Sequence, residues 1–381
     1  MQLRAPPTGA VKGCPGILHE YTEDLTAFEY TRGTHSKPHT LIFIGGLGDG
    51  LGTVKYLNDL EVTLQGTKWS IFAPVLSSSY NGWGMGSLGQ DIAEIAACAH
   101  YVREYKEPLY GVGKVVLMGH STGSQDIMQY LSSANPQPLD APPGRDSKVK
   151  FRNRAYPASF TRPPVDGAII QAPVSDREAI LWEIQTGTER DSPEAMKAMY
   201  EVAVANAQRN TYEEQNSDRG CPPIRRDTLV PLSVTGRIGY PANTAVSSRR
   251  FLSLVSPESP LGPAEDDMFS SDLGDDKLKQ TFGAVRAQSL LRENAQLMVL
   301  YSGRDQSVPP WVDKEGLLQR WRAALGEDLW YPGSMVIPGA SHSLSDDDQE
   351  EPKRILCERT LIFLHDIEMR VPSVLRFSLA I

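Results

Sequence analysis

The chain has 381 residues, of which 40% are hydrophobic and 22% are charged, and its formal net charge at pH 7 is −9. These proportions are typical of a globular protein with a sizeable buried core, and they exclude disorder along the whole chain. The acidic balance argues against a nucleic acid as the main partner, because binding to phosphates needs a basic surface. At this length, one large α/β core with an insertion is as well supported as two average domains.

The four cysteines lie far apart, at positions 14, 98, 221 and 357, and form no Cys-x-x-Cys pair. This spacing argues against a zinc site and against a dense disulfide framework. Prolines and glycines interrupt the first 16 residues, so we expect no secretory signal, and no stretch has the apolar length of a membrane span. We therefore expect a cytoplasmic protein that has no metal site and no cofactor and does not bind membranes. The sequence does not fix the oligomeric state.

The first elements that the sequence predicts are short strands. Strands at residues 17–21 and 27–31 form an antiparallel start, and an apolar strand at 40–44 leads into a glycine-rich loop at 45–50. Such a loop is a plain turn, a phosphate-binding loop, or a loop that offers a backbone amide to a reacting oxygen. A phosphate loop needs a Lys-Ser or Lys-Thr pair after its glycines, and this chain lacks that pair, so the phosphate loop is the weakest of the three.

A strand at 69–75 precedes a loop that contains Tyr80 and Trp83. Ligands gather at the carboxyl ends of strands in α/β sheets, so both aromatic side chains are candidates for a substrate pocket. Ordinary packing over the sheet is at least as well supported for each of them. Ser87 followed by Gln90 predicts a capping box at the start of a helix, in which apolar residues recur at helical spacing.

The stretch from 115 to 131 carries the most informative pattern. Residues 115–118 are a short apolar strand, and residues 125–131 have the composition of a helix. Between them lies Gly119-His120-Ser121-Thr122-Gly123, a Gly-x-Ser-x-Gly pattern at a sharp turn from strand to helix. The two glycines give the clearance that such a turn needs, and the amides at the start of the helix favour an oxyanion there. The pattern predicts that Ser121 is a nucleophile, with a plain glycine-rich turn as the alternative.

The segment that follows this helix, residues 132–164, is rich in proline and basic residues, and we expect it to be a long surface excursion. A strand is expected next, at 165–171. Helical patterns then alternate with proline-rich stretches, and Pro193 begins one of these helices. The acidic stretch at 266–276 is most simply a solvated surface.

The alternation of strands and helices stops between residues 175 and 283 and then resumes. This interruption predicts a core made of residues 1–174 and 284–381, into which residues 175–283 are inserted. We expect the insertion to be a largely helical cap that covers the site.

The last part of the chain supplies two further candidates. A strand at 297–302 leads into a loop with Asp305, and a strand at 335–337 leads into a loop with His342. A helix is expected between these strands, at 317–325, and another at the C-terminal end.

An α/β-hydrolase fold places its acid after one late strand and its histidine after the next, in the chain order nucleophile, acid, base. Ser121, Asp305 and His342 follow this order, and each lies just past the carboxyl end of a predicted strand. Three agreeing placements predict an α/β-hydrolase fold, with a mostly parallel central sheet flanked by helices, and a catalytic triad.

The chemistry of such a triad assigns the roles. His342 would take the proton of Ser121 and return it to the leaving alcohol, and Asp305 would orient the imidazole and stabilise its cation. The backbone amides of Leu47 and Thr122 would form the oxyanion hole, with Gly46 beside them as a candidate for the pocket wall.

Other residues compete for these roles less well. His120 lies inside the elbow, where its side chain is expected to point away from the serine hydroxyl, so packing or orienting is its expected role. Asp126, on the following helix, is first a structural carboxylate that could orient a nearby loop. The acidic residues at 346–348 form a charge run, most simply a solvated approach to the C-terminal helix.

With these residues in place, the chain resembles a fungal family of α/β-hydrolases that includes the intracellular esterases acting on fusarinine-type siderophores. The resemblance extends from about residue 17 to residue 364, apart from the excursion at 132–164. It rests on short motifs: Gly119-His120-Ser121-Thr122-Gly123-Ser124-Gln125-Asp126, Ser77-Ser78-Ser79-Tyr80 before Gly86-Ser87-Leu88, Phe251-Leu252-Ser253-Leu254, Asp267-Met268-Phe269-Ser270-Ser271-Asp272-Leu273 and Ser302-Gly303-Arg304-Asp305.

The resemblance implies hydrolysis of the ester bonds that link hydroxamate units in a siderophore of the fusarinine C or triacetylfusarinine C type, which would aid iron release inside the cell. Joined hydroxamates bind iron tightly because the later chelation steps are intramolecular, and cutting the links removes that advantage. Iron would then belong to the substrate, which is a small-molecule ester in either its iron-free or its iron-loaded form. The acidic stretch from 265 to 276 would attract a substrate with free amines.

Two other functions stay open at this point. One is a carboxylesterase, lactonase or thioesterase for another small metabolite, with the same triad under a different cap. The other is a binding protein that kept the fold but lost turnover, which an intact triad makes the weakest of the three.

Overall fold

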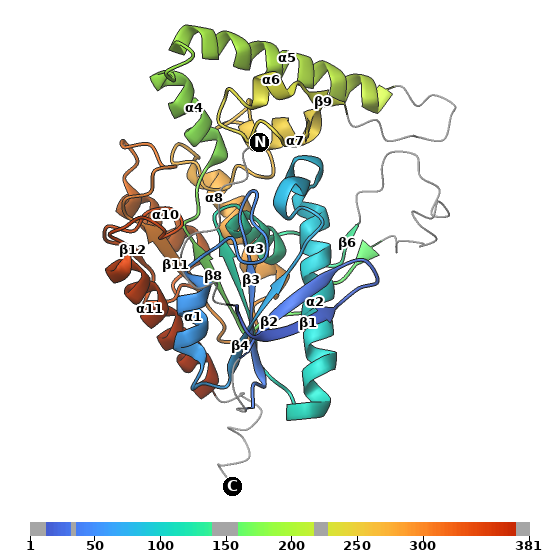
Figure 1. Ribbon diagram of the computed structural model, residues 1–381, viewed down its shortest axis with the longest axis vertical. Helices are drawn as coiled ribbons and strands as arrows, with labels where there is room; N and C mark the ends of the chain where they lie inside the picture. Colours follow the sequence, from blue (N-terminus) through green and yellow to red (C-terminus); the bar gives the residue numbers. More distant parts are fainter. Residues whose placement is uncertain (1–12, 32–35, 139–158, 217–227, 371–381) are drawn as a thin grey trace.

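The computed structural model describes residues 13–31, 36–138, 159–216 and 228–370. An eight-stranded sheet forms its centre, in the order β1-β2-β4-β3-β5-β8-β11-β12 (Figure 1). The strands of this sheet are β1 (Gly16–Glu20), β2 (Thr26–Tyr30), β3 (His39–Ile44), β4 (Trp69–Pro74), β5 (Val115–His120), β8 (Gly167–Gln171), β11 (Leu297–Ser302) and β12 (Met335–Ile337).

The sheet is antiparallel at one edge and parallel elsewhere. β1 pairs with β2, and β2 with β4, in antiparallel register, whereas all pairs from β4 through β3 and β5 to β12 are parallel. The central strands β5 and β8 are buried along their whole length, which explains why their sequences are almost continuously apolar. The carboxyl ends of the parallel strands therefore meet at one edge of the sheet, as an active site in this architecture requires.

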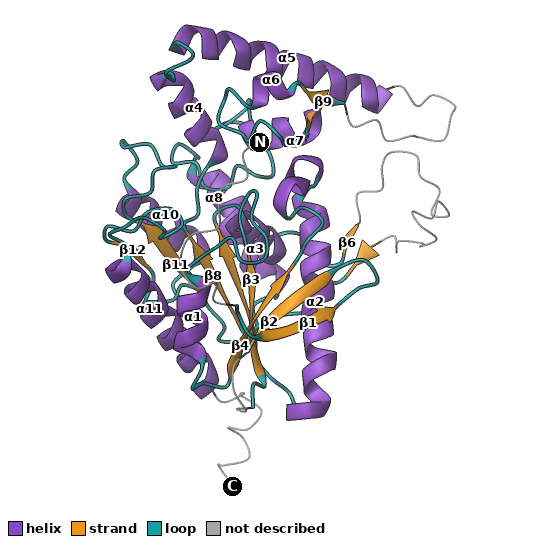
Figure 2. Ribbon diagram, viewed as in Figure 1, coloured by secondary structure: helices purple, strands orange, loops and turns teal. Residues whose placement is uncertain are grey.

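Helices cover both faces of the sheet (Figure 2). On one face, α1 (Leu57–Leu64) packs beside α11 (Glu350–Met369) in a shared hydrophobic cluster. The other face carries α2 (Leu88–Tyr110), α3 (Gly123–Ser132), α8 (Asp275–Thr281), α9 (Val285–Gln288) and α10 (Lys314–Leu325). The prediction of an α/β-hydrolase fold, with a mostly parallel sheet between helices, is confirmed.

A layer of helices lies over the carboxyl ends of the strands, at the top of Figure 1. It consists of α4 (Asp176–Thr186), α5 (Pro193–Asn216), α6 (Leu232–Thr235), α7 (Ser248–Val255) and the short strands β9 (Leu229–Val230) and β10 (Val246–Ser247). These elements share a hydrophobic cluster that is separate from those of the sheet, and Phe251 of α7 is fully buried in it.

The last part of the expected insertion, from residue 268 to residue 283, packs against the core and not with the cap helices. Phe269, Leu278 and Phe282 belong to the hydrophobic cluster on the α2 and α3 face of the sheet, and the rings of Phe269 and Phe282 each lie 5.3 Å from that of Trp321 on α10. We therefore propose that the cap comprises residues 175–267, a shorter insertion than the expected 175–283.

Two local features differ from what the sequence predicts. Helix α1 has no start signal in the sequence, because its N-cap Tyr56 makes no side-chain capping bond. Ser87 does cap α2, since its Oγ accepts a hydrogen bond from the amide of Gln90, but the Gln90 side chain bonds to Ser77 and Glu94 instead of completing a capping box. None of the helices in the described ranges is long and apolar enough to span a bilayer.

Most of the excursion at 132–164 lies outside the described residues. Cys221 also lies outside them. At the ends of the excursion, β6 (Gln137–Pro138) pairs with β7 (Ser159–Phe160) in antiparallel register. Of the cysteines that the structure describes, Cys14 is exposed, Cys98 and Cys357 are buried, and all three are free thiols.

Candidate active site

Ser121 occupies the sharp turn between β5 and α3. Its backbone has a φ of 54°, which a side-chain-bearing residue adopts only when its surroundings enforce it. The two flanking glycines permit this turn: a Cβ on Gly119 would lie 2.1 Å from the carbonyl oxygen of Gly123, and a Cβ on Gly123 would lie 2.5 Å from that of Ile44. The turn therefore presents Ser121 at the carboxyl edge of the sheet, as the Gly-x-Ser-x-Gly pattern predicts.

The structure brings Ser121, His342 and Asp305 together. His342 Nε2 lies 2.8 Å from Ser121 Oγ, and His342 Nδ1 lies 2.8 Å from Asp305 Oδ2. With Nδ1–H donating to the carboxylate, Nε2 carries the lone pair that accepts the serine hydroxyl. Ser121 and Asp305 are buried, at 8% and 5% exposure. The three side chains are thus arranged for proton transfer from serine to imidazole.

The electrostatics around His342 favour its protonated form. Burial of the ring lowers its pKa, but the hydrogen bond and the negative charge of Asp305 outweigh burial, and Asp176 and Asp49 add to them, so the net pKa of His342 is raised above 6.5. An imidazole with a raised pKa is a stronger base toward the serine proton and a more stable cation once it has taken that proton.

His120 is a buried neutral neighbour of the proposed base. Its ring centroid lies 5.2 Å from that of His342, and its Nδ1 lies 2.5 Å from Oε1 of Gln171. Burial and the nearby charge of His342 lower the pKa of His120 to about 4. Its contacts match the packing and orienting role that the sequence suggests.

Gln171, the last residue of β8, is a residue that sequence reasoning missed. Its backbone oxygen accepts the amide hydrogen of Ser121 at 3.0 Å, and its side chain meets His120 and the hydroxyl of Tyr56. Gln171 therefore holds the elbow from the neighbouring strand. A glutamine that ends an otherwise apolar buried strand was the signal available in the sequence.

The glycine-rich loop after β3 lies against the elbow. A Cβ on Gly46 would lie 2.5 Å from the Cβ of Ser121, so only glycine fits there. The amide of Gly46 donates to Asp49 Oδ2. Among the described residues, the amides of Leu47 and Thr122 donate to no protein acceptor. Two backbone donors are thus available next to the serine, as an oxyanion hole needs.

The two aromatic candidates lie in different places. Trp83 is 3% exposed, lines the cavity beside the loop at 45–51, and packs 5.3 Å from Tyr240 of the cap. Tyr80 is 45% exposed and does not line that cavity; its hydroxyl accepts the amide hydrogen of Leu51, and its ring covers Gly50. Tyr80 therefore supports the glycine-rich loop from its outer side.

The acidic stretch at 266–276 is divided between the interior and the surface. The expectation of a solvated face holds for Asp272, Asp275 and Asp276, which are exposed. It is wrong for Asp266 and Asp267, which are 2% and 4% exposed and bonded to buried or half-buried partners. The sequence could not separate the two groups, because the turn after α7 that buries the first pair has no periodic signal.

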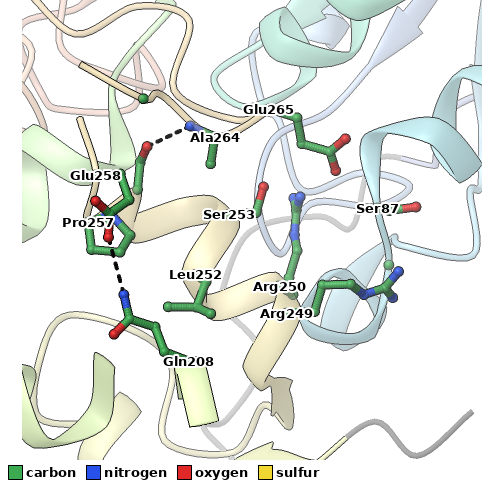
Figure 3. Close-up of a pocket in the computed structure, with 13 residues that line it drawn as sticks. Ser87, Gln208, Arg249, Arg250, Leu252, Ser253, Pro257, Glu258, Ala264 and Glu265 are labelled. Atoms are coloured by element: carbon green, nitrogen blue, oxygen red, sulfur yellow. Dashed lines mark hydrogen bonds between the residues drawn. The ribbon is translucent and has the colours of Figure 1, made fainter. Parts of the chain in front are cut away.

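A second, larger cavity of about 430 Å³ lies at the join of α7 with the start of α2, away from the triad. Figure 3 shows the side chain of Arg250 extending toward Glu265, and that of Arg249 extending toward the segment that carries Ser87. The same view shows a hydrogen bond from Gln208 on α5 to Glu258 and one from the amide of Ala264 to Ser256 Oγ. These bonds connect the loop after α7 to α5 and to the end of α7. Arg250 lines both this cavity and the smaller one beside the elbow.

The part of the chain that the structure describes contains no cluster of three or more His, Cys, Asp or Glu side chains that could hold a metal ion.

Comparison with known proteins places the chain in a family. Residues 1–365 match a family model whose description is "Protein of unknown function (DUF1749)". The chain belongs to this family. The family resemblance inferred from the sequence motifs is confirmed by the relatives described next.

Two curated relatives cover nearly the whole chain. The chain is 50% identical over 376 residues to "Esterase AN6793" of Emericella nidulans, a match that covers 96% of each protein. It is 49% identical over 360 residues to "Fusarinine C esterase sidJ" of Aspergillus fumigatus, covering 92% of this chain and 96% of the relative. Among solved structures, it resembles "Siderophore hydrolase EstB from Aspergillus fumigatus" with a TM-score of 0.78 and 47% identity, covering 96% of this chain and 100% of the other.

Proposed function

We propose that this member of the DUF1749 family is a serine esterase that hydrolyses the ester bonds of a hydroxamate siderophore of the fusarinine C or triacetylfusarinine C type. The observation that carries the proposal is the pair of 2.8 Å contacts that join Ser121 to His342 and His342 to Asp305. The substrate class is supported by relatives at 47–50% identity that are described as an esterase, a fusarinine C esterase and a siderophore hydrolase.

The reaction follows from the geometry of these side chains. Ser121 Oγ attacks the ester carbonyl carbon while its proton passes to Nε2 of His342, and the carbonyl oxygen gains negative charge. The amides of Leu47 and Thr122 would donate to that oxygen, which stabilises the tetrahedral intermediate. The intermediate collapses by breaking the bond to the alcohol oxygen, which leaves with the proton held by His342.

The second half of the reaction releases the acid. The product of the first half is an acyl group bonded to Ser121 Oγ. Water, deprotonated by His342, attacks its carbonyl carbon, and the bond to Oγ breaks as the proton returns to the serine. Asp305 keeps Nδ1–H oriented throughout both halves and stabilises the imidazolium.

The purpose of the cleavage would be release of iron. Hydrolysis of the links between hydroxamate units separates ligands that bind one ion together, and the affinity for iron falls with the loss of effective concentration. Iron would enter as part of the substrate, and both the iron-free and the ferric siderophore are candidate substrates. We place the reaction in the cytoplasm, a proposal consistent with the three free thiols in the described residues.

A comparison of substrates tests the proposed specificity. The kcat/KM values for fusarinine C in its iron-free and ferric forms would be measured beside an aliphatic ester, a lactone and a thioester of similar size. We expect one of the fusarinine C forms to have the highest kcat/KM. A higher value for another class would assign the enzyme to the alternative group of carboxylesterases, lactonases or thioesterases.

A further inference from the structure

Three buried carboxyl groups gather around one arginine at the junction of cap and core. Asp91 on α2, Asp126 on α3 and Asp266 after α7 are 3%, 6% and 2% exposed. Arg250 on α7 is 4% exposed, and its Nη1 donates to Asp266 Oδ2 at 2.6 Å. Ser253 also donates to that oxygen of Asp266. Arg250 therefore forms an ion pair with Asp266, whose negative charge balances that of the guanidinium.

Asp91 and Asp126 lack such a partner. Among the described residues, no ion pair within 4.0 Å joins either carboxyl group to a cation, and Oδ1 of each accepts no hydrogen bond. Burial raises the pKa of both groups, and it outweighs the hydrogen bond of Ser78 to Asp91 and the nearby charge of Arg250. The pKa of Asp91 rises to about 7, and that of Asp126 rises well above its usual range. Asp91 can therefore exchange its proton for another cation near neutral pH.

The other charges that face these two groups have the same sign. Glu94 on α2, Asp266 and Glu265 in the turn after α7 all add negative potential at Asp91 or Asp126. Apart from Arg250, whose charge is matched by Asp266, the charged groups that face the site are negative, so a cation that enters it would be stabilised.

A cavity connects these carboxyl groups to the elbow. Asp91, Asp126 and Arg250 line a cavity of about 40 Å³ that Gly46, Leu47 and Thr122 also line. This volume admits a group the size of an ammonium with its neighbouring carbon and nothing much larger. Leu47 and Thr122 are the residues whose amides would hold the carbonyl oxygen of the substrate. A group in the cavity must therefore be attached next to that carbonyl, on the acyl side of the ester.

We propose that Asp91 and Asp126 form a subsite for a protonated amine on the carbon next to the ester carbonyl, so that the enzyme prefers 2-aminoacyl esters. This inference rests on the proposed esterase function, because it assumes that the carbonyl lies at the oxyanion hole. Acylation of the amine removes its charge and adds bulk, so an N-acylated ester loses both the ion pair and the fit.

The test compares matched small esters. Alanine methyl ester carries the amine, methyl lactate carries a hydroxyl of similar size, and N-acetylalanine methyl ester carries a blocked amine. Methanol release gives kcat/KM for each with the native protein, with Asp91→Asn and with Asp126→Asn. We expect the native protein to prefer the amino ester over methyl lactate by about tenfold or more. In each asparagine variant that ratio should fall toward one.

Asp24→Asn is the matched control, because Asp24 is an exposed carboxylate between β1 and β2, outside the acidic stretch at 265–276. It should keep the native ratio. A native protein without preference for the amino ester, or asparagine variants that both keep the preference, would overturn the subsite. Absence of any Ser121-dependent ester hydrolysis, on fusarinine C and on the methyl esters alike, would instead overturn the proposed function.

A second measurement needs no variant and does not depend on turnover of the methyl esters. Ethylammonium chloride and ethanol are compared as inhibitors of fusarinine C hydrolysis at constant ionic strength. We expect ethylammonium to compete with substrate at a concentration about tenfold or more below that of ethanol. Equal inhibition by the two compounds would contradict the subsite while leaving the esterase function intact.

Discussion

Gly46 shows how little space the site leaves around its nucleophile. A side chain at this position would collide with the Cβ of Ser121, and Ser121 cannot move away, because its strained backbone is fixed by the close contacts of Gly119 and Gly123. The requirement for glycine here comes from the approach of two loops that are 75 residues apart in sequence, and it is a tertiary constraint.

Gly46→Ala should reduce kcat/KM by about a hundredfold, because a displacement of about 1 Å at the reacting atoms costs that much. Ester hydrolysis and the far-ultraviolet circular dichroism of the variant would be measured together. Gly66→Ala is the control, because a Cβ at Gly66 meets no atom within 4 Å. Near-native kcat/KM in Gly46→Ala would show that the loop does not adjoin the reacting serine.

The acidic limb of the pH–rate profile reports on His342. The base must be neutral, so kcat/KM rises as pH passes through the pKa of His342, which lies above 6.5 because Asp305 outweighs the effect of burial. In Asp305→Asn the effect of burial remains and the carboxylate is gone, so the limb should shift to lower pH. The maximal rate should fall by about 10⁴-fold, as in other triads without their acid.

Profiles from about pH 5 to about pH 9 for both proteins would check this prediction. An unchanged position of the acidic limb in Asp305→Asn would mean that another group controls the titration. Asp176 and Asp49, which also raise the pKa of His342, are the groups to replace next in that case.

At the scale of elements, α4 is joined to the core by charge as well as by packing. Arg177 in its first turn pairs with Asp272 and lies 3.8 Å from Asp267, whose side chain is fully buried. Replacement of Arg177 would leave the carboxylate of Asp267 buried with serine hydroxyls alone as partners. The pair with Asp272 therefore links the cap to the core, and the contact with Asp267 stabilises the cap itself.

Arg177→Met should lower the free energy of unfolding by about 1–3 kcal/mol, because a buried carboxylate loses its cation. Arg304→Met removes an exposed pair with Asp348 and should change stability by less than about 1 kcal/mol. Urea unfolding of the two variants beside the native protein would measure both values. Equal effects would show that the position of Arg177 confers no extra stability.

The sequence predicted those features that follow from local pattern and chain order. The strands at 297–302 and 335–337 have the bounds of β11 and β12, and the residues placed after β5, β11 and β12 meet in space because parallel strands end at one edge. The sequence did not indicate that Tyr80 lies outside the loop, or that Asp91 and Asp126 share a cavity. Those placements depend on how the cap and α2 pack, which no local periodicity encodes.

At the scale of the whole molecule, the cap and the sheet edge together define the substrate that fits. The sheet brings the nucleophile, base and acid to one edge, and α7 places Arg250 and Asp266 against α2 and α3 beside that edge. The proposed triad is carried by loops at the edge of the sheet. The proposed substrate preference comes instead from side chains at the junction of the cap with α2 and α3. This division explains how one fold serves many esters.

A mass-spectrometric assay of siderophore cleavage tests whether Ser121 is the nucleophile that hydrolyses fusarinine C. Native protein and Ser121→Ala would each be incubated with fusarinine C, iron-free and ferric, and the linear and monomeric products followed over time. We expect these products with the native protein and a loss of about 10³-fold or more in rate with Ser121→Ala. Products formed at equal rates by both proteins would contradict the proposed nucleophile, and intact fusarinine C with the native protein would contradict the proposed substrate.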